Sequence, residues 1–136
     1  MAATQVLGYQ QIWTDGLNRG DVSVADQAFA RDCVIHVTGF SEPIRGVEAW
    51  KAAAAGFFAA FPVMKITIDE QISAGDTTVT RWHARGVHNG SFGPIPPTGR
   101  AVAFNGLILD HLVDGKVKER WEQFDQAAIL QQIGVA

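Results

Sequence analysis

Hydrophobic residues near the start of the chain recur at intervals of three and four, which is the spacing of one face of an α-helix. The residues of this stripe are Val6, Tyr9, Trp13 and Leu17. The polar run 18–21 ends the helix, and Asp21 is a residue type that caps a helix N-terminus. We therefore expect a second, short helix that begins after Asp21 and continues to about Phe29.

A second hydrophobic stripe with helical spacing occupies the middle of the chain. Its members are Trp50, Ala54, Phe57, Phe58 and Phe61. Pro62 ends this third helix, because proline lacks the backbone N–H that a helix interior requires. The β-rich run 33–38 before it predicts a short strand, and the stretch 39–46, which contains Pro43, predicts a loop.

The second half of the chain has the pattern of four consecutive strands separated by turn residues. The predicted strands are Lys65–Ser73, Thr77–His88, Arg100–Leu112 and Lys116–Phe124. Tight turns at 75–76 and 114–115 and a proline-rich loop at 89–99 connect them. Asp125 is placed to cap a last helix, Gln126–Ile133. Helices followed by an antiparallel meander predict an α+β fold, in which a curved sheet closed by helices forms a cone with a pocket inside.

The hairpin at 114–115 decides which side chains face the pocket. A three-residue loop with Gly115 as a bulge places Asp110 opposite Lys118, whereas a two-residue turn would place Asp110 opposite Glu119, a like-charge pair. We prefer the first register, in which Trp121 faces Leu107. It predicts an inner face of Phe104, Gly106, Ile108, Arg120, Glu122 and Phe124, and an outer face of Ala103, Asn105, Leu107, Leu109, Glu119, Trp121 and Gln123. In the preceding strand the more apolar face is Trp82, Ala84 and Gly86, ending at His88.

The composition excludes several classes of function. The chain has 136 residues, of which 47% are apolar and 18% charged, so a single domain spanning 1–136 can bury a sizeable core. The net charge of −3 and the absence of a basic stripe argue against nucleic acid as a partner. The N-terminus lacks the pattern of a signal peptide, and the longest apolar run, 50–64, is too short to span a bilayer. The single cysteine, Cys33, excludes an intrachain disulfide, so we expect a cytoplasmic protein without membrane contact.

Several segments together resemble one protein family. They are Leu17-Asn18-Arg19-Gly20, the stretch GVHNGSFGPIPPTGR at Gly86–Arg100, the hairpin VDGKV at Val113–Val117, and the end from Asp125 through Leu130-Gln131-Gln132-Ile133-Gly134. Their order and spacing are similar to those of SnoaL-like polyketide cyclases, also called ester cyclases, in the NTF2-like superfamily. The resemblance implies a cone-shaped α+β barrel that assembles as dimers or tetramers. For the characterised cyclases it implies a cofactor-independent intramolecular aldol closure of an anthracycline precursor.

The resemblance also assigns positions within the site. The cyclases have an acid/base aspartate in the last strand, and the matching position here is Glu122. Their histidine on the neighbouring strand is replaced by Ile108, which cannot form a hydrogen bond, whereas His88 in the proline-rich stretch matches the family. Independently of the family, an acid among apolar neighbours is where a protein can raise the pKa of a proton-transfer group. The alternative is a structural ion pair of Glu122 with Arg120 or Lys118.

The predicted catalytic residues are Glu122 and His88. The predicted substrate-binding residues are Trp13, His36, Trp50, Phe58, Trp82, Phe104, Ile108, Arg120 and Phe124. His88 either donates a hydrogen bond into the pocket or anchors the loop after it, and His36 either packs against the third helix or points at the ligand. Because no HxH or HExxH spacing and no nucleotide-binding loop occur, we expect neither a metal ion nor a cofactor. The predicted ligand is a small apolar or polycyclic molecule.

Three functions remain open. The first is cofactor-independent acid/base chemistry on an apolar carbonyl compound, with His88, Arg120, the Trp82 indole or a water stabilising an enolate oxygen. The second is a binding module without chemistry, suggested by Ile108 in place of the histidine. The third is hydrolysis of an epoxide or lactone, which needs a second acid, and Asp110 is the only strand candidate. Large apolar residues on the opposite face predict a homodimer or homotetramer, and they are Leu107, Leu109 and Trp121.

Overall fold

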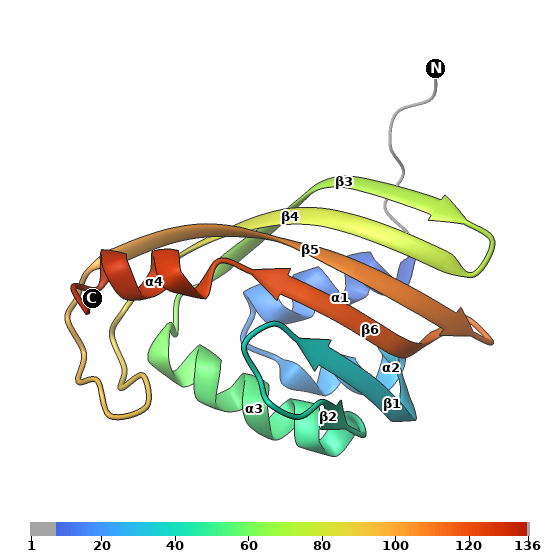
Figure 1. The fold of residues 1–136 in the computed structure, drawn as a ribbon, viewed down its shortest axis with the longest axis horizontal. Helices are drawn as coiled ribbons and strands as arrows, with labels where there is room; N and C mark the ends of the chain where they lie inside the picture. Colours follow the sequence, from blue (N-terminus) through green and yellow to red (C-terminus); the bar gives the residue numbers. More distant parts are fainter. Residues whose placement is uncertain (1–7, 136) are drawn as a thin grey trace.

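The helices and strands follow the predicted pattern closely. The computed structural model describes residues 8–135 (Figure 1). In chain order the elements are α1 (Gly8–Asn18), a 3₁₀ turn η1 (Val22–Val24), α2 (Ala25–Ala28), β1 (Phe29–Val37), β2 (Ile44–Arg45), α3 (Val47–Ala60), β3 (Lys65–Ala74), β4 (Thr77–Val87), β5 (Ala101–Val113), β6 (Lys116–Phe124) and α4 (Gln126–Gln132). Val6 and the Tyr9 side chain lie outside the described part, while Trp13 and Leu17 of the same stripe are buried. No helix in 8–135 has the length and apolar character needed to cross a membrane.

One curved sheet of six strands forms the body of the molecule, in the order β2-β1-β6-β5-β4-β3. Its long strands arch over α1 and α3, which lie on the concave side (Figure 1). The predicted α+β fold, a curved sheet closed by the N-terminal helices with a short C-terminal helix, is therefore confirmed. The expectation of a purely antiparallel sheet is wrong in one place, because β1 pairs with β6 in parallel. These two strands are distant in sequence, so no turn signal marks their pairing.

The β5–β6 hairpin has a register different from the predicted one. A two-residue turn at 114–115 joins the strands, and both of its residues have positive φ. A bulge opposite 111–112 makes Lys118 an extra residue on β6, so that Asp110 faces Arg120 instead of Lys118. This bulge removes the like-charge pair that argued against a two-residue turn.

The inner and outer faces of the hairpin nevertheless remain as predicted. The two registers differ by two residues, and side chains alternate between the faces of a sheet with a period of two. Ile108 therefore faces Glu122 directly, and Trp121 faces Leu109 instead of Leu107. The change matters for which residues are partners, and it leaves the pocket-facing set unaltered.

Aromatic packing fixes the helices against the sheet. Trp13 of α1 lies between Trp50 of α3 and Phe29 of β1, with ring centroids 4.4 and 4.5 Å away. Fully burying a ring of this size stabilises a fold by about 1.5–3 kcal/mol. All three rings belong to the hydrophobic core, and Trp13 and Trp50 also line the cavity described below.

Both predicted capping aspartates act as caps. An Asp21 carboxylate oxygen accepts from the Ser23 backbone N–H at 3.0 Å, and one of Asp125 accepts from Ala128 at 2.9 Å. The Gln132 side chain of α4 then bonds both backbone groups of Ala103 at 2.7 and 2.9 Å. These bonds hold α4 against β5 at one end of the sheet.

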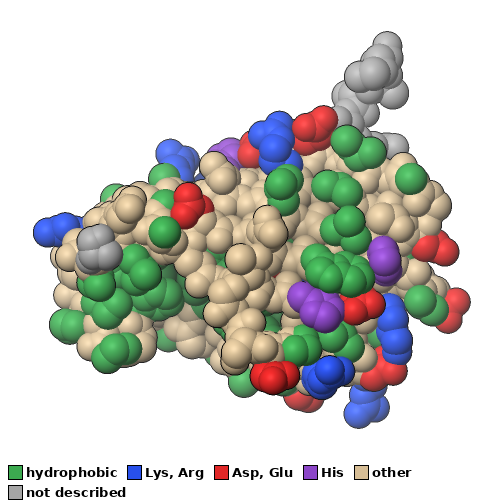
Figure 2. All heavy atoms as spheres, viewed as in Figure 1, with side chains coloured by type: hydrophobic (Ala, Val, Ile, Leu, Met, Phe, Trp, Pro, Cys, Tyr) green, Lys and Arg blue, Asp and Glu red, His purple; other side chains and the backbone are tan. Residues whose placement is uncertain are grey.

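The convex face of the sheet carries an exposed aromatic and apolar patch. Leu107 and Trp121 are 50% and 38% exposed. His36 of β1 stacks on Trp121 of β6 with centroids 5.1 Å apart, and His111 of β5 meets the same ring edge-on. Figure 2 shows hydrophobic and histidine side chains gathered on this face. Association of copies of this chain through the convex face stays a prediction.

Candidate functional site

A cavity of about 150 Å³ lies between the concave face of the sheet and helices α1 and α3. The lining residues are Trp13, Leu17, Val37, Phe40, Ile44, Trp50, Ala53, Ala54, Phe57, Phe58, Met64, Ile66, Ile68, Trp82, Ala84, Phe104, Ile108, Glu122 and Phe124. Apart from one carboxyl group, their side chains are aliphatic, aromatic or thioether groups. Such a lining gives the cavity a low local dielectric, in which a charge is poorly stabilised.

Among the residues whose side chains the structure describes, Glu122 is the only ionisable one that lines the cavity. It lies on β6 between Val37 of β1 and Ile108 of β5, neither of which can offer it a side-chain hydrogen bond. Its side chain is 18% exposed. Burial raises the pKa of this carboxyl group above its ordinary value of 4.5, the Arg120 charge lowers it in part, and the Asp110 charge raises it further. The group is therefore poised to exchange a proton closer to neutral pH than a surface glutamate.

Arg120 lies beneath this site in a buried ion pair with Asp110. Its Nε donates to Asp110 Oδ1 at 2.6 Å, and its Nη2 donates to Oδ2 at 2.9 Å. The guanidinium carbon is 5.2 Å from the ring centre of Trp13 and 4.8 Å from that of Phe29. Asp110 therefore holds the guanidinium in place and neutralises most of its charge locally.

The predicted alternative, a structural ion pair of Glu122, is present only in a weak form. Arg120 Nη1 is 4.0 Å from Glu122 Oε1, which is too long for a hydrogen bond. Lys118, the other predicted partner, pairs with Asp32 instead. Arg120 itself is not among the lining residues, and its role in substrate binding stays a prediction. The observed register places Asp110 opposite Arg120, where the predicted register placed Ile108.

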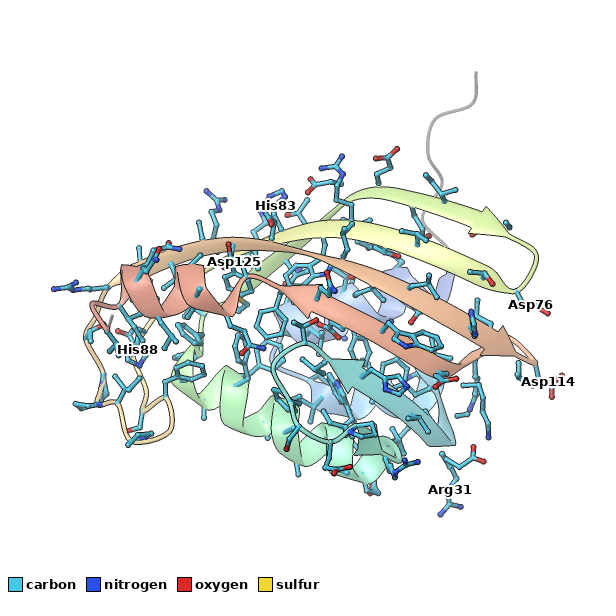
Figure 3. The ribbon with its side chains drawn as sticks, in the orientation of Figure 1. Arg31, Asp76, His83, His88, Asp114 and Asp125 are labelled. Carbon is cyan, nitrogen blue, oxygen red and sulfur yellow. The ribbon has the colours of Figure 1, made fainter. Side chains whose placement is uncertain are left out.

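The structure brings most of the predicted site residues together. Those that line the cavity are Trp13, Trp50, Phe58, Trp82, Phe104, Ile108, Glu122 and Phe124. They come from α1, α3 and the strands β4, β5 and β6. Figure 3 shows side chains filling the space under the sheet. The predicted residues outside the lining are His36, His88 and Arg120.

His36 lies on the convex face, contrary to both predicted positions. Its Nε2 is 2.7 Å from Glu119 Oε2, and its ring stacks on Trp121. The alternation along β1 explains this: Cys33 and Ile35 face the core, so the residue after Ile35 must face outward. That signal was present in the sequence, but its use required knowing that β1 belongs to the sheet.

His88 is buried beside the proline-rich loop and does not line the cavity. The Thr98 backbone N–H donates to its Nδ1 at 3.3 Å, and its backbone bonds Gly99 and Arg100 at 2.8 and 2.9 Å. In Figure 3 it lies at the end of the sheet, below α4. Of the two predicted roles, anchoring the loop is the one that these contacts support.

Sequence reasoning missed the part of the cavity formed by β1, β3 and the turn after β1. The missed residues with large side chains include Val37, Phe40, Ile44, Ile66 and Ile68. Short hydrophobic runs do not reveal their neighbours, because a strand far away in sequence decides which cavity they face.

The arrangement allows one kind of chemistry directly. A single carboxyl group beside an apolar ligand can take a proton from carbon and return it. Hydrolysis of an epoxide or lactone needs a second acid, and Asp110, the only strand candidate, is bound to Arg120 outside the lining. In 8–135 no three His, Cys, Asp or Glu side chains are grouped as metal ligands.

Comparison with known proteins agrees with this architecture. The family model for SnoaL-like polyketide cyclase matches residues 6–133. No curated protein sequence matches the chain significantly. Among solved structures, IdmH, a candidate polyketide cyclase from Streptomyces antibioticus, is 30% identical and superposes with a TM-score of 0.80, covering 95% of this chain and 100% of its own.

Two more distant structures share the fold. A candidate SnoaL-like polyketide cyclase from Jannaschia sp. CCS1 is 21% identical, with a TM-score of 0.85 over 94% of this chain and 90% of its own. A protein from Catenulispora acidiphila with a ketosteroid isomerase-like fold, solved in complex with trimethylamine, is 15% identical, with a TM-score of 0.82 over 97% and 96%. The family match over nearly the whole length confirms the resemblance, and the chain belongs to the SnoaL-like polyketide cyclase family.

Proposed function

We propose that this chain catalyses cofactor-independent acid/base chemistry on an apolar, polyketide-like carbonyl compound, either an aldol-type ring closure or an isomerisation. Glu122 is the proton-transfer group. The observation that carries the proposal is a lone carboxyl group, with a raised pKa, on the wall of an otherwise apolar cavity. Membership of a family named for polyketide cyclases supports the same class of substrate.

The steps follow from this one group. Ionised Glu122 takes a proton from the carbon next to a substrate carbonyl, and the electron pair left behind delocalises onto the carbonyl oxygen as an enolate. The enolate carbon then attacks a second carbonyl of the same molecule, and the new alkoxide takes the proton back from Glu122. In an isomerisation the proton returns to a different carbon. A carboxyl group with a raised pKa suits both halves of this exchange.

The enolate oxygen needs a hydrogen-bond donor. Of the three protein donors considered, His88, Arg120 and Trp82, only Trp82 lines the cavity. Its Nε1 is buried and has no hydrogen-bond partner among residues 8–135. Gly106 on the neighbouring strand gives the indole its place, because a Cβ there would lie 2.5 Å from the ring. Trp82 is therefore our candidate donor, and Trp82→Phe should slow the reaction while the ring still fills the wall.

The test measures proton transfer on carbon, for which the natural substrate is not needed. In D₂O, the protein should speed the exchange of the α-protons of phenylacetone, followed by ¹H NMR. Glu122→Gln should lower that rate by about 10²–10⁴-fold, the usual contribution of a positioned acid/base group. Glu119→Gln, which alters a carboxylate on the convex side of the same strand, is the matched control and should exchange at the wild-type rate. Undiminished exchange in Glu122→Gln would assign the chemistry elsewhere.

A second function, binding without chemistry, is favoured by one observation. Ile108 faces Glu122 directly, so the carboxyl group lacks a hydrogen-bonding partner across the sheet. A binding module of this kind would take up phenylacetone in calorimetry and leave its α-protons unexchanged. Measurable exchange by the wild-type protein would exclude it.

A further inference from the structure

The cavity is small for the class of ligand that the proposed function requires. Pockets that enclose a whole drug-sized ligand measure about 300–1,000 Å³. The volume here is about 150 Å³, and an apolar cavity of about that size is filled by one benzene ring. A polyketide-like molecule therefore cannot be enclosed completely, and part of it must pass through an opening.

The lining residues show where that opening lies. Only two of them, Phe40 and Ala53, are classed as exposed, while the others are buried or half-buried. Phe40 is 51% exposed, in the turn after β1, and Ala53 lies on α3. Among the described lining residues, the exposed side chains of Phe40 and Ala53 are therefore where we place the opening.

The turn that carries Phe40 is fixed and adjoins the acid. The Thr38 backbone N–H donates to the Glu122 backbone carbonyl at 3.1 Å, and Phe40 N–H donates to Val37 at 3.1 Å. Gln126 of α4 donates to the Thr38 carbonyl at 2.7 Å. Hydrogen bonds from β6 and α4 thus hold the backbone of the turn that carries Phe40, and one of them is made by Glu122 itself.

We propose that Phe40 forms an apolar shelf at the mouth of the site and selects elongated substrates. The aromatic walls of the inner chamber take one ring-sized, carbonyl-bearing end beside Glu122, and the rest of an apolar molecule lies over Phe40. Phe40 is then a specificity-determining residue, and the substrate class is an aryl ketone with an extended apolar part. This inference builds on the proposed function, because it uses the same cavity.

A chain-length series of phenyl alkyl ketones tests the shelf. Acetophenone, butyrophenone and hexanophenone would be titrated calorimetrically into the wild-type protein. Affinity should rise on the order of threefold for each added methylene, somewhat less than the about fourfold expected for complete burial. Phe40→Ala should bind acetophenone within about twofold of wild type, yet lose about tenfold for hexanophenone as the gain per methylene shrinks. Phe40→Leu should keep most of the gain.

Leu107→Ala is the matched control, because Leu107 is 50% exposed but lies on the convex face. It should leave the whole series unchanged. The proposal would be overturned if Phe40→Ala lost the same affinity for all three ketones, or lost none. It would also be overturned if the wild-type protein bound none of the series. The ketone affinities test the role of Phe40 alone, because binding at equilibrium does not depend on the reaction. The proposed chemistry is tested separately, by the α-proton exchange rate of Glu122→Gln.

Discussion

Two neighbouring cross-strand pairs on the concave face of the sheet give a carboxyl group opposite environments. Asp110 faces Arg120, which meets it with two hydrogen bonds in a fully buried pair. Glu122, two residues after Arg120 on β6, faces Ile108 and the cavity. The first carboxylate meets a cation at hydrogen-bond distance, while burial raises the pKa of the second and disfavours its charge. What lies across the strand, more than the acid itself, sets the surroundings of each carboxyl group.

The Asp110–Arg120 pair also affects the pKa of Glu122. Arg120 Nη1 is 4.0 Å from Glu122 Oε1, so an uncompensated guanidinium would hold Glu122 ionised. Asp110 engages that charge, and its own negative charge opposes the effect of Arg120 on the pKa of Glu122. The ion pair thus supports the fold at one position and permits the raised pKa at the next.

The largest expected effect comes from breaking the ion pair. Arg120→Met leaves Asp110 buried without its cation, and such a change costs about 3–5 kcal/mol of unfolding free energy. Urea unfolding followed by tryptophan fluorescence would measure it. A loss below about 1 kcal/mol would mean that the Asp110 carboxylate is not shielded from solvent as its burial indicates.

Asp110→Asn tests how the Asp110 charge affects the pKa of Glu122. It removes a negative charge that raises the pKa of Glu122 and leaves the Arg120 charge uncompensated, so this pKa should fall. Proton abstraction needs the ionised carboxylate, and the phenylacetone exchange rate should therefore rise at lower pH than in the wild-type protein. An unchanged or higher midpoint would contradict the coupling.

Glu122→Gln should affect stability with the opposite sign to Arg120→Met. The native-state pKa of Glu122 is raised, so the native state holds the proton more tightly than the unfolded chain does, and stability falls as pH rises from about 4.5 through the raised value. Glutamine cannot ionise, so the variant should be more stable than wild type at pH 8 and lose that advantage near pH 4. Each unit of upward shift corresponds to about 1.4 kcal/mol. A variant less stable than wild type at pH 8 would count against a disfavoured charge.

The smallest effect is expected for Glu119, the other carboxylate of β6. Glu119 pairs with His36 on the convex face, where both side chains are 38% exposed. An exposed pair of this kind contributes about 0–1 kcal/mol, so Glu119→Gln should change the unfolding free energy by less than about 1 kcal/mol. A large change would place this pair, and His36 with it, in a more important role than the geometry supports.

Sequence reasoning found the faces of the sheet but not the partners within it. The acid at Glu122 and its apolar neighbours Phe104 and Ile108 follow from alternation alone, and an error of two residues in register does not disturb them. The Asp110–Arg120 pair depends on a bulge at one position of β6, which no turn signal marks.

Long-range pairing explains the other failures. His36 and Phe40 belong to β1 and its following turn, whose place in the sheet is set by parallel pairing with a strand at the far end of the chain. Such a pairing leaves no local pattern, because parallel strands are joined by long connections instead of hairpins. The resemblance to the family implies the fold, but which predicted residues reach the cavity depends on the long-range pairing of the strands.

The proposed function depends on Glu122 titrating in apolar, largely buried surroundings, and its own titration can be followed. Carbon-13 NMR of protein labelled at the glutamate side-chain carboxyl carbons, with the Glu122 signal assigned by its absence in Glu122→Gln, would follow the group through pH. We expect a midpoint above 4.5 that rises further when toluene fills the cavity and excludes the remaining water. A midpoint at or below 4.5, unmoved by toluene, would contradict this placement of Glu122.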